Sequence, residues 1–211
     1  LVCQLWREVG EEPGLWASVI IRMTRENMSN MVERLDCRRL RAVRELCVRS
    51  LGRLEVSDEM VEAVTRHPGL RVVGVRGANL SSVDPGLLAR MVKKLEEVKM
   101  MFSQLRGQQL EAVMTALCES DSGLKILDIS WNNLSRVDAG LLARALNMLE
   151  EVGMDNTHLT VEQWTAIFTA INQENSTMKQ LNISCNNLSS VDAGLLASAV
   201  NILEEVVMNL T

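Results

Sequence analysis

From residue 70 onward, the apolar residues alternate between the spacing of a β-strand and the spacing of an α-helix. Each unit opens with apolar residues at its first, fourth and sixth positions, and the last two alternate as a short strand requires. A stretch with a 3.6-residue apolar period follows and predicts a helix. Shorter and longer units alternate, because the spacing between their first residues is 25, then 29, in turn. These first residues are Leu70, Leu95, Leu124, Leu149, Met178 and Leu203.

Three segments of the sequence, at 79–89, 133–143 and 187–197, are nearly identical copies that follow one another at equal spacing. Ten of fourteen positions are identical between Ser135–Met148 and Ser189–Ile202. A strand followed by a helix of this size cannot bury its apolar face alone, so neighbouring units must stack. The repeat therefore favours a binding scaffold over an enzyme with a pocket.

The helix starts carry their own signals. Asp84 is a predicted N-cap with Pro85 at the first helical position, where the missing N–H costs nothing. In a longer unit, Thr160 and Gln163 form a capping-box pattern. The cap at Asp84 returns at Asp138 and Asp192.

Charges alternate in sign at the second position of successive units. In a parallel sheet these residues would be lateral neighbours, so each charge would lie between two opposite ones. Exposed pairs stabilise little, but a slipped register would bring like charges together. We therefore expect this row to support the register. It consists of Arg71, Glu96, Lys125, Glu150, Lys179 and Glu204.

The repeat resembles the leucine-rich repeat family, in its ribonuclease-inhibitor-like type, over residues 70–211. The resemblance rests on Leu124-x-x-Leu127-x-Ile129-x-x-Asn132-x-Leu134 and on the same pattern at 178–188. It implies an α/β solenoid in the shape of a horseshoe, with a parallel β-sheet on the concave face and α-helices on the convex face. It also implies that the side chain at the ninth position, such as Asn132, bonds backbone groups where the chain leaves the strand.

Residues 17–69 are predicted to form divergent leucine-rich repeats. Apolar spacing predicts a strand at 43–48 and a helix over Ser57–Arg66. A further unit is expected before them, with a strand around 15–21 and a helix around 28–35. The last predicted unit begins at Leu203 and the chain stops inside it, so 70–211 is expected to be truncated at its C-terminus.

Residues 1–16 resemble the C-terminal half of an F-box motif. An F-box followed directly by leucine-rich repeats is a known domain order. The resemblance implies the substrate-recognition part of a cullin-RING ubiquitin ligase, with the cullin-ligase adaptor as a partner through a complete F-box upstream. Alternatively, 1–16 is an N-terminal cap whose tryptophans cover the open end of the stack. The matching residues are Val2, Cys3, Trp6, Arg7, Pro13, Leu15 and Trp16.

Composition narrows the class of partner. The net charge of −5 argues against nucleic acid, because phosphate contacts need a basic face. No run of about 18 apolar residues exists, so no membrane partner is expected. The five cysteines are an odd number without close pairs, which suits reduced thiols and a cytoplasmic or nuclear location.

No catalytic, cofactor-binding or metal-binding set is predicted. His67 and His158 lie in a turn and a repeat loop, away from any metal or nucleophile motif. Neighbouring glutamates such as Glu96 and Glu97 would point to opposite faces of a strand, so they do not form acid–base pairs. Cys185 occupies the unit position of Trp131 and is interpreted as a repeat variant.

Binding is expected on the concave face, at the third, fifth and seventh unit positions. The fold does not fix residue identity at the fifth and seventh positions, because these vary between units. Trp131 stands beside this face, either as a binding residue or as a cover for the neighbouring turn. The acidic character of the longer units indicates a partner with basic groups. The candidates are Arg76, Glu97, Lys99, Met101, Asp128, Ser130, Trp131, Glu151, Asp155, Asn182 and Ser184.

Two functions are consistent with this sequence. The first is a protein–protein interaction scaffold that recognises substrates for an F-box ubiquitin ligase. The second is a ribonuclease-inhibitor-like or innate-sensor repeat domain that binds or autoinhibits without a ubiquitin link. Neither function requires catalytic residues in this chain.

Overall fold

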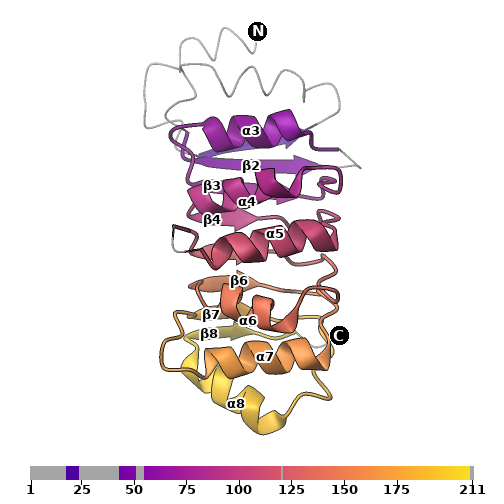
Figure 1. Cartoon of the computed structure of the whole chain (residues 1–211), viewed down its shortest axis with the longest axis vertical. Coiled ribbons are helices and arrows are strands. Elements are labelled where there is room, and N and C mark those ends of the chain that lie inside the picture. Colours follow the sequence, from indigo (N-terminus) through magenta and orange to yellow (C-terminus); the bar gives the residue numbers. More distant parts are fainter. Residues whose placement is uncertain (1–17, 24–42, 51–54, 120, 210–211) are drawn as a thin grey trace, which may run out of the picture.

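A parallel β-sheet, with helices stacked along one side of it, makes up the computed structural model (Figure 1). The structure describes residues 18–23, 43–50, 55–119 and 121–209. The eight strands of the sheet are ordered as they occur in the chain. The predicted α/β solenoid, with the sheet on one face and the helices on the other, is confirmed.

Strand and helix alternate from β2 onward, and the bounds follow the predicted units. The strands are β1 Ser18–Met23, β2 Glu45–Ser50, β3 Val72–Arg76, β4 Glu97–Lys99, β5 Ile126–Asp128, β6 Glu151–Gly153, β7 Gln180–Asn182 and β8 Glu205–Val207. The helices are α3 Asp58–Arg66, α4 Pro85–Lys94, α5 Gly107–Leu117, α6 Ala139–Leu146, α7 Val161–Ile171 and α8 Ala193–Ile202. From β3 onward, each strand begins at the third position of its predicted unit.

The strand predicted at 43–48 is found as β2, and the helix predicted over Ser57–Arg66 is found as α3. The helix expected around 28–35 and the F-box-like segment 1–16 lie outside the described residues. The division into residues 1–16, 17–69 and 70–211 stays a prediction.

An aliphatic core fills the space between the sheet and the helices. The central residue of each short strand points inward, so Leu127, Val152 and Leu181 are buried. The buried face of α7 includes Trp164, Ile167, Phe168 and Ile171, and Trp164 stacks on Phe168 at 5.4 Å between ring centroids. Dispersion and burial along this continuous core hold the units together.

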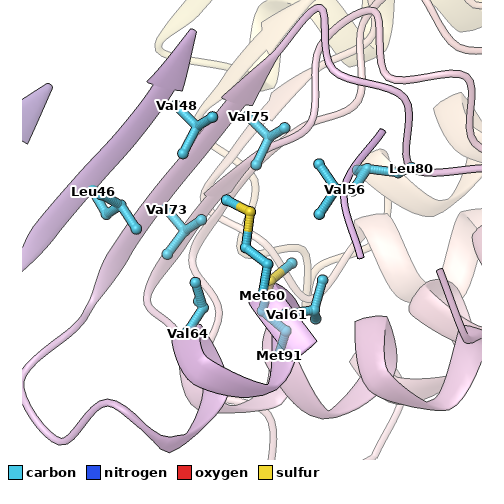
Figure 2. Close-up of a pocket in the computed structure, with 10 residues that line it drawn as sticks. All are labelled: Leu46, Val48, Val56, Met60, Val61, Val64, Val73, Val75, Leu80 and Met91. Atoms are coloured by element: carbon cyan, nitrogen blue, oxygen red, sulfur yellow. The ribbon is translucent and has the colours of Figure 1, made fainter. Parts of the chain in front are cut away.

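The core between β2, β3, α3 and α4 contains one small gap (Figure 2). Its volume is about 10 Å³, and Met60 and Met91 reach into this region among valine and leucine side chains. A space of this size holds about one water, and its lining offers no polar partner. We interpret it as a packing gap rather than a ligand site.

Asn132 bonds the backbone of two neighbouring units where the chain leaves β5. Its Nδ2 donates to the carbonyl oxygens of Met100, Ile129 and Ser130, at 2.7, 3.0 and 3.2 Å. Its Oδ1 accepts from the N–H groups of Ser103 and Leu105. Asn186 repeats the pattern one double unit later, toward Met154, Ile183, Ser184 and Thr157. The role that the resemblance implied for the ninth position is confirmed.

Two buried glutamines add a second tie between units. Gln163 accepts from the Thr160 N–H as the predicted capping box requires, and its Nε2 also donates to the carbonyls of Leu134 and Val137. Gln109 makes the same bonds to Leu80 and Val83, one double unit earlier. The sequence identified only the capping part of this role.

The predicted helix caps are present. The side chains of Asp84, Asp138 and Asp192 accept the N–H groups of the residues three positions later. These bonds satisfy donors that the first helical turn cannot pair internally.

The alternating charges of the second position lie side by side, as predicted. Arg71 is 3.7 Å from Glu96, and Glu150 lies between Lys125 at 3.7 Å and Lys179 at 2.6 Å. The hydrogen bond from Lys179 holds the pKa of Glu150 below its usual value, with Lys125 acting in the same direction. The same contact raises the pKa of Lys179. The backbone of this row is also bonded, because the Lys125 carbonyl accepts both the Glu150 and Glu151 N–H groups.

We expect Asn132→Ala to lower the free energy of unfolding by about 2–4 kcal/mol, because it leaves several buried backbone groups without a partner. Urea unfolding followed by circular dichroism measures the change. Asn133→Ala is the matched control, since Asn133 is exposed and bonds only within its own turn. Equal losses in the two variants would contradict the role given to Asn132.

We expect Lys179→Met to raise the pKa of Glu150 toward its usual value, and by more than Lys125→Met does, because Lys179 makes the shorter contact. A depressed carboxyl pKa contributes stability above the unfolded-state pKa. That contribution is lost as pH falls through the folded-state pKa. Carboxyl ¹³C NMR titration measures the shift, and equal effects of the two lysine variants would count against this arrangement.

Candidate functional site

The concave face is built from the third and fifth unit positions. In β4 to β7 the middle residue of each strand is buried, whereas its two neighbours are partly exposed. The parallel register places Asp128 between Lys99 and Gly153, and Glu151 between Ile126 and Gln180. The outward side chains of several units therefore form one continuous surface.

A hollow of about 190 Å³ lies on this surface over β5, β6, β7 and β8. Gly153 makes part of the space, because it has no side chain in the middle of the row. The Asp128 carboxyl group occupies the position above it: a Cβ on Gly153 would lie 2.6 Å from Asp128 Cγ. Asp128 is held there by the N–H of Ser130, which donates to its Oδ1 at 2.9 Å.

Acidic side chains line the hollow. Asp128, Glu151 and Glu205 all belong to its wall, beside the amides of Gln180 and Asn182. None of the three acids takes part in an ion pair within 4.0 Å among the described residues. The hollow therefore carries an excess of negative charge, which Lys99 at its edge offsets only in part.

Lys99 borders the hollow but is already paired. Its Nζ lies 2.6 Å from Oε1 of Glu97 on the same strand. This hydrogen bond raises the pKa of Lys99, burial opposes the shift, and the negative charges of Glu151 and Asp128 favour it. Lys99 is thus a charged ammonium at the edge of an acidic surface.

Two aromatic rings stand where β4 and β5 end. Phe102 and Trp131 are 58% and 44% exposed, and their rings meet edge to face at 6.3 Å between centroids. Trp131 Nε1 donates to Oδ2 of Asp155 at 2.9 Å, which fixes the orientation of the indole ring. Trp131 and Asp155 follow Asp128 and Gly153 of the hollow wall by three and two residues, so the indole stands just after the strands that line the hollow.

The eighth unit position has a left-handed backbone in every unit from β3 to β7. The φ angles are 73° at Gly77, 54° at Phe102, 60° at Trp131, 48° at Asn156 and 56° at Cys185. Glycine adopts this conformation without strain, whereas an L-residue pays about 1–2 kcal/mol. Phe102 and Trp131 therefore occupy positions where the fold alone would favour glycine. Aromatic residues at such positions favour a role in binding rather than in folding.

Cys185 occupies the equivalent position one double unit after Trp131. Burial raises the pKa of its thiol, and the neighbouring Asp155 acts in the same direction. A raised pKa keeps the sulfur as the less reactive thiol. This agrees with the interpretation of Cys185 as a repeat variant.

The structure brings most of the predicted binding residues to one surface. Glu97, Lys99, Asp128, Glu151 and Asn182 share the concave rows, and Trp131 and Asp155 adjoin them. Met101 is partly exposed after β4, and Arg76 is exposed at the end of β3. Partner binding by these residues stays a prediction.

Ser130 and Ser184 require a correction. They are only 1% and 4% exposed, so they do not present a surface to a partner. Their hydroxyl oxygens accept the backbone N–H groups of Asp155 and Asn209, at 3.0 and 3.1 Å. A small hydroxyl at the seventh position thus joins one unit to the next.

Sequence reasoning placed Gly153 and Glu205 on the concave face without choosing them as binding candidates, and it missed Phe102. Phe102 could have been found, because it has the same unit position as Trp131, one unit earlier. It also missed that Arg22, Arg49 and Arg76 are register partners on β1, β2 and β3.

The described part of the chain contains no group of three or more His, Cys, Asp or Glu residues that could hold a metal ion. In the same residues no helix has the length and apolar character to cross a membrane. The arrangement over β4–β8 can bind through charge, shape and aromatic surface.

We expect Gly153→Ala to destabilise the protein by about 1–3 kcal/mol, because the new methyl group collides with the Asp128 carboxyl group. Asp128→Ala in the same chain should restore most of this loss, which a double-mutant cycle by urea unfolding measures. Gly123→Ala is the control, since a Cβ there meets nothing within 4 Å. Additive losses at residues 128 and 153 would contradict the contact.

Neither a protein-family model nor a curated protein sequence matches the chain. Solved structures do match. One is a complex of Toll with Spatzle from Drosophila, with a TM-score of 0.59 and 16% identity over 92% of this chain. Another is the TLR13–ssRNA13 complex, with a TM-score of 0.53 and 10% identity over 95% of this chain.

The chain spans only part of these proteins, 23% of the first and 34% of the second. At such low identity the likeness concerns the fold. Both Toll and TLR13 are leucine-rich repeat proteins. Together with the repeating strand–helix units and the asparagine ties between them, this shows that the chain has the leucine-rich repeat fold.

Proposed function

We propose that this chain is a protein-interaction scaffold whose concave face binds a protein partner. The observation that carries the proposal is the contrast between the two sides of each strand. The inward fourth position is always Val or Leu, whereas the outward fifth position changes from Lys99 to Asp128, Gly153, Asn182 and Val207. The fold constrains the first set and leaves the second open to selection for a ligand.

The chemistry of this surface supports binding rather than catalysis. It combines a hollow with unpaired carboxylates and two exposed aromatic rings, and aromatic residues are enriched where protein interfaces gain most of their energy. One of the similar structures contains RNA, but an acidic hollow would repel a phosphate backbone. We therefore favour a protein as the partner.

At a finer level, we infer that the scaffold recognises substrates as part of an F-box subunit of a cullin-RING ubiquitin ligase. The support is the F-box-like sequence of residues 1–16, including Trp6 and Arg7, directly ahead of the repeats. Recruitment requires only a surface that binds the target, because other subunits of such a ligase transfer ubiquitin. The cullin-ligase adaptor would then be a second partner.

The alternative is a ribonuclease-inhibitor-like or innate-sensor repeat domain without a ubiquitin link. Its support is the alternation of shorter and longer units along the stack, which the resemblance to that type includes. The two functions share the concave face and differ in whether the adaptor binds.

Affinity purification of the protein in its full-length form, with quantitative mass spectrometry, tests the proposal. We expect the cullin-ligase adaptor to be recovered, and Trp6→Ala to reduce its recovery by about tenfold while the concave-face partners remain. The paired variant Asp128→Asn/Glu151→Gln should have the opposite effect. It should lose other partners and keep the adaptor.

Partners lost with the concave-face variant but no adaptor would support the scaffold and reject the F-box assignment. Recovery of every partner by both variants would contradict the scaffold as well. Circular dichroism of each variant establishes that the loss does not come from unfolding.

A further inference from the structure

We propose that the hollow over Gly153, together with the Phe102–Trp131 pair, is a docking site for an extended protein segment that carries an arginine. The arginine side chain would enter the hollow, and a neighbouring part of the segment would cover the aromatic rings. This inference rests on the proposed scaffold function and names the chemistry of the partner.

Charge complementarity selects a basic group. Asp128 and Glu151 face the hollow from β5 and β6, and Glu205 faces it from β8. Lys99 lies nearby but is engaged by Glu97 at 2.6 Å. A guanidinium group from a partner would supply the missing positive charge, and it pairs with carboxylates through two parallel hydrogen bonds.

The size of the hollow suits one side chain. Its volume of about 190 Å³ is below the ~300 Å³ at which small-molecule pockets typically begin. The hollow is also open on a sheet face, so the group that enters it can remain attached to a longer segment. Both features favour a side chain of a partner protein over a free metabolite.

The aromatic pair extends the site at the end of β5. The rings of Phe102 and Trp131 support each other edge to face, and Asp155 fixes the indole through its Nε1. A guanidinium group interacts favourably with an indole face as well as with carboxylates. The equivalent residue in another unit is Gly77, so the turn does not need an aromatic side chain for its backbone.

Selection of random linear dodecapeptides displayed on phage, with the purified chain as the target, tests this inference. We expect the selected peptides to contain an arginine beside an apolar residue. Dissociation constants of the synthetic peptides are then measured by fluorescence polarisation at two salt concentrations. Binding should weaken with salt, because the contact is partly electrostatic.

Substitutions in the hollow and at Trp131 test whether the peptides bind there. Asp128→Asn/Glu151→Gln should raise the dissociation constant about tenfold or more, and Trp131→Gly should raise it about fivefold while keeping the left-handed turn. The matched controls are Glu111→Gln on α5 and Met148→Ala after α6, both exposed and outside the concave face. They should change the constant by less than about twofold.

The outcomes separate this inference from the broader function. Selected peptides that bind the concave face without a basic residue, or with lysine as tightly as arginine, would overturn the arginine site and leave the scaffold standing. If no concave-face variant changed peptide binding, or if no peptide were selected, both the arginine site and the scaffold function would be overturned. Urea unfolding of each variant identifies losses that come from instability.

Discussion

The constraint on which the rest of this structure depends is that each unit leaves backbone groups and apolar side chains that only its neighbour can satisfy. Three-residue strands such as β5 make few ladder bonds of their own. Asn132 and Gln163 complete the bonding from the side, and the second-position carbonyls each accept two N–H groups from the next unit. Stacking is therefore fixed by directional bonds as well as by burial.

Because other positions supply the packing and the backbone bonds, the residues of the concave face can vary without loss of the fold. The inward residue of each short strand carries the packing, and the ninth position carries the backbone bonds. The identities of residues such as Asp128 and Gly153 are then constrained mainly by their contact with each other. The Asp128 carboxyl group lies where a Cβ of residue 153 would be. The candidate site uses this freedom: a glycine in one unit makes room for the carboxylate of the preceding one.

The sequence predicted the fold well because its signals are periodic. Strand spacing, the Asp84 type of cap, the alternating charges and the asparagine ties all follow from repeated local patterns. The site was predicted only in part. Burial of Ser130 and Ser184 could not be read from strand alternation, because it comes from hydrogen bonds of their hydroxyl groups to the backbone of the next unit. The hollow depends on which side chains meet across strands, and no single unit encodes that.

The charge ladder, the asparagine ties and the glutamine bridges share a common period of two units. Removing one unit would place Lys125 beside Arg71 or Glu150 beside Glu96, and would put like tie residues, such as Asn132 and Asn186, in neighbouring units. Removing or duplicating a pair would preserve every junction. We therefore expect the array to gain or lose units in pairs during evolution, so that the number of units changes in steps of two.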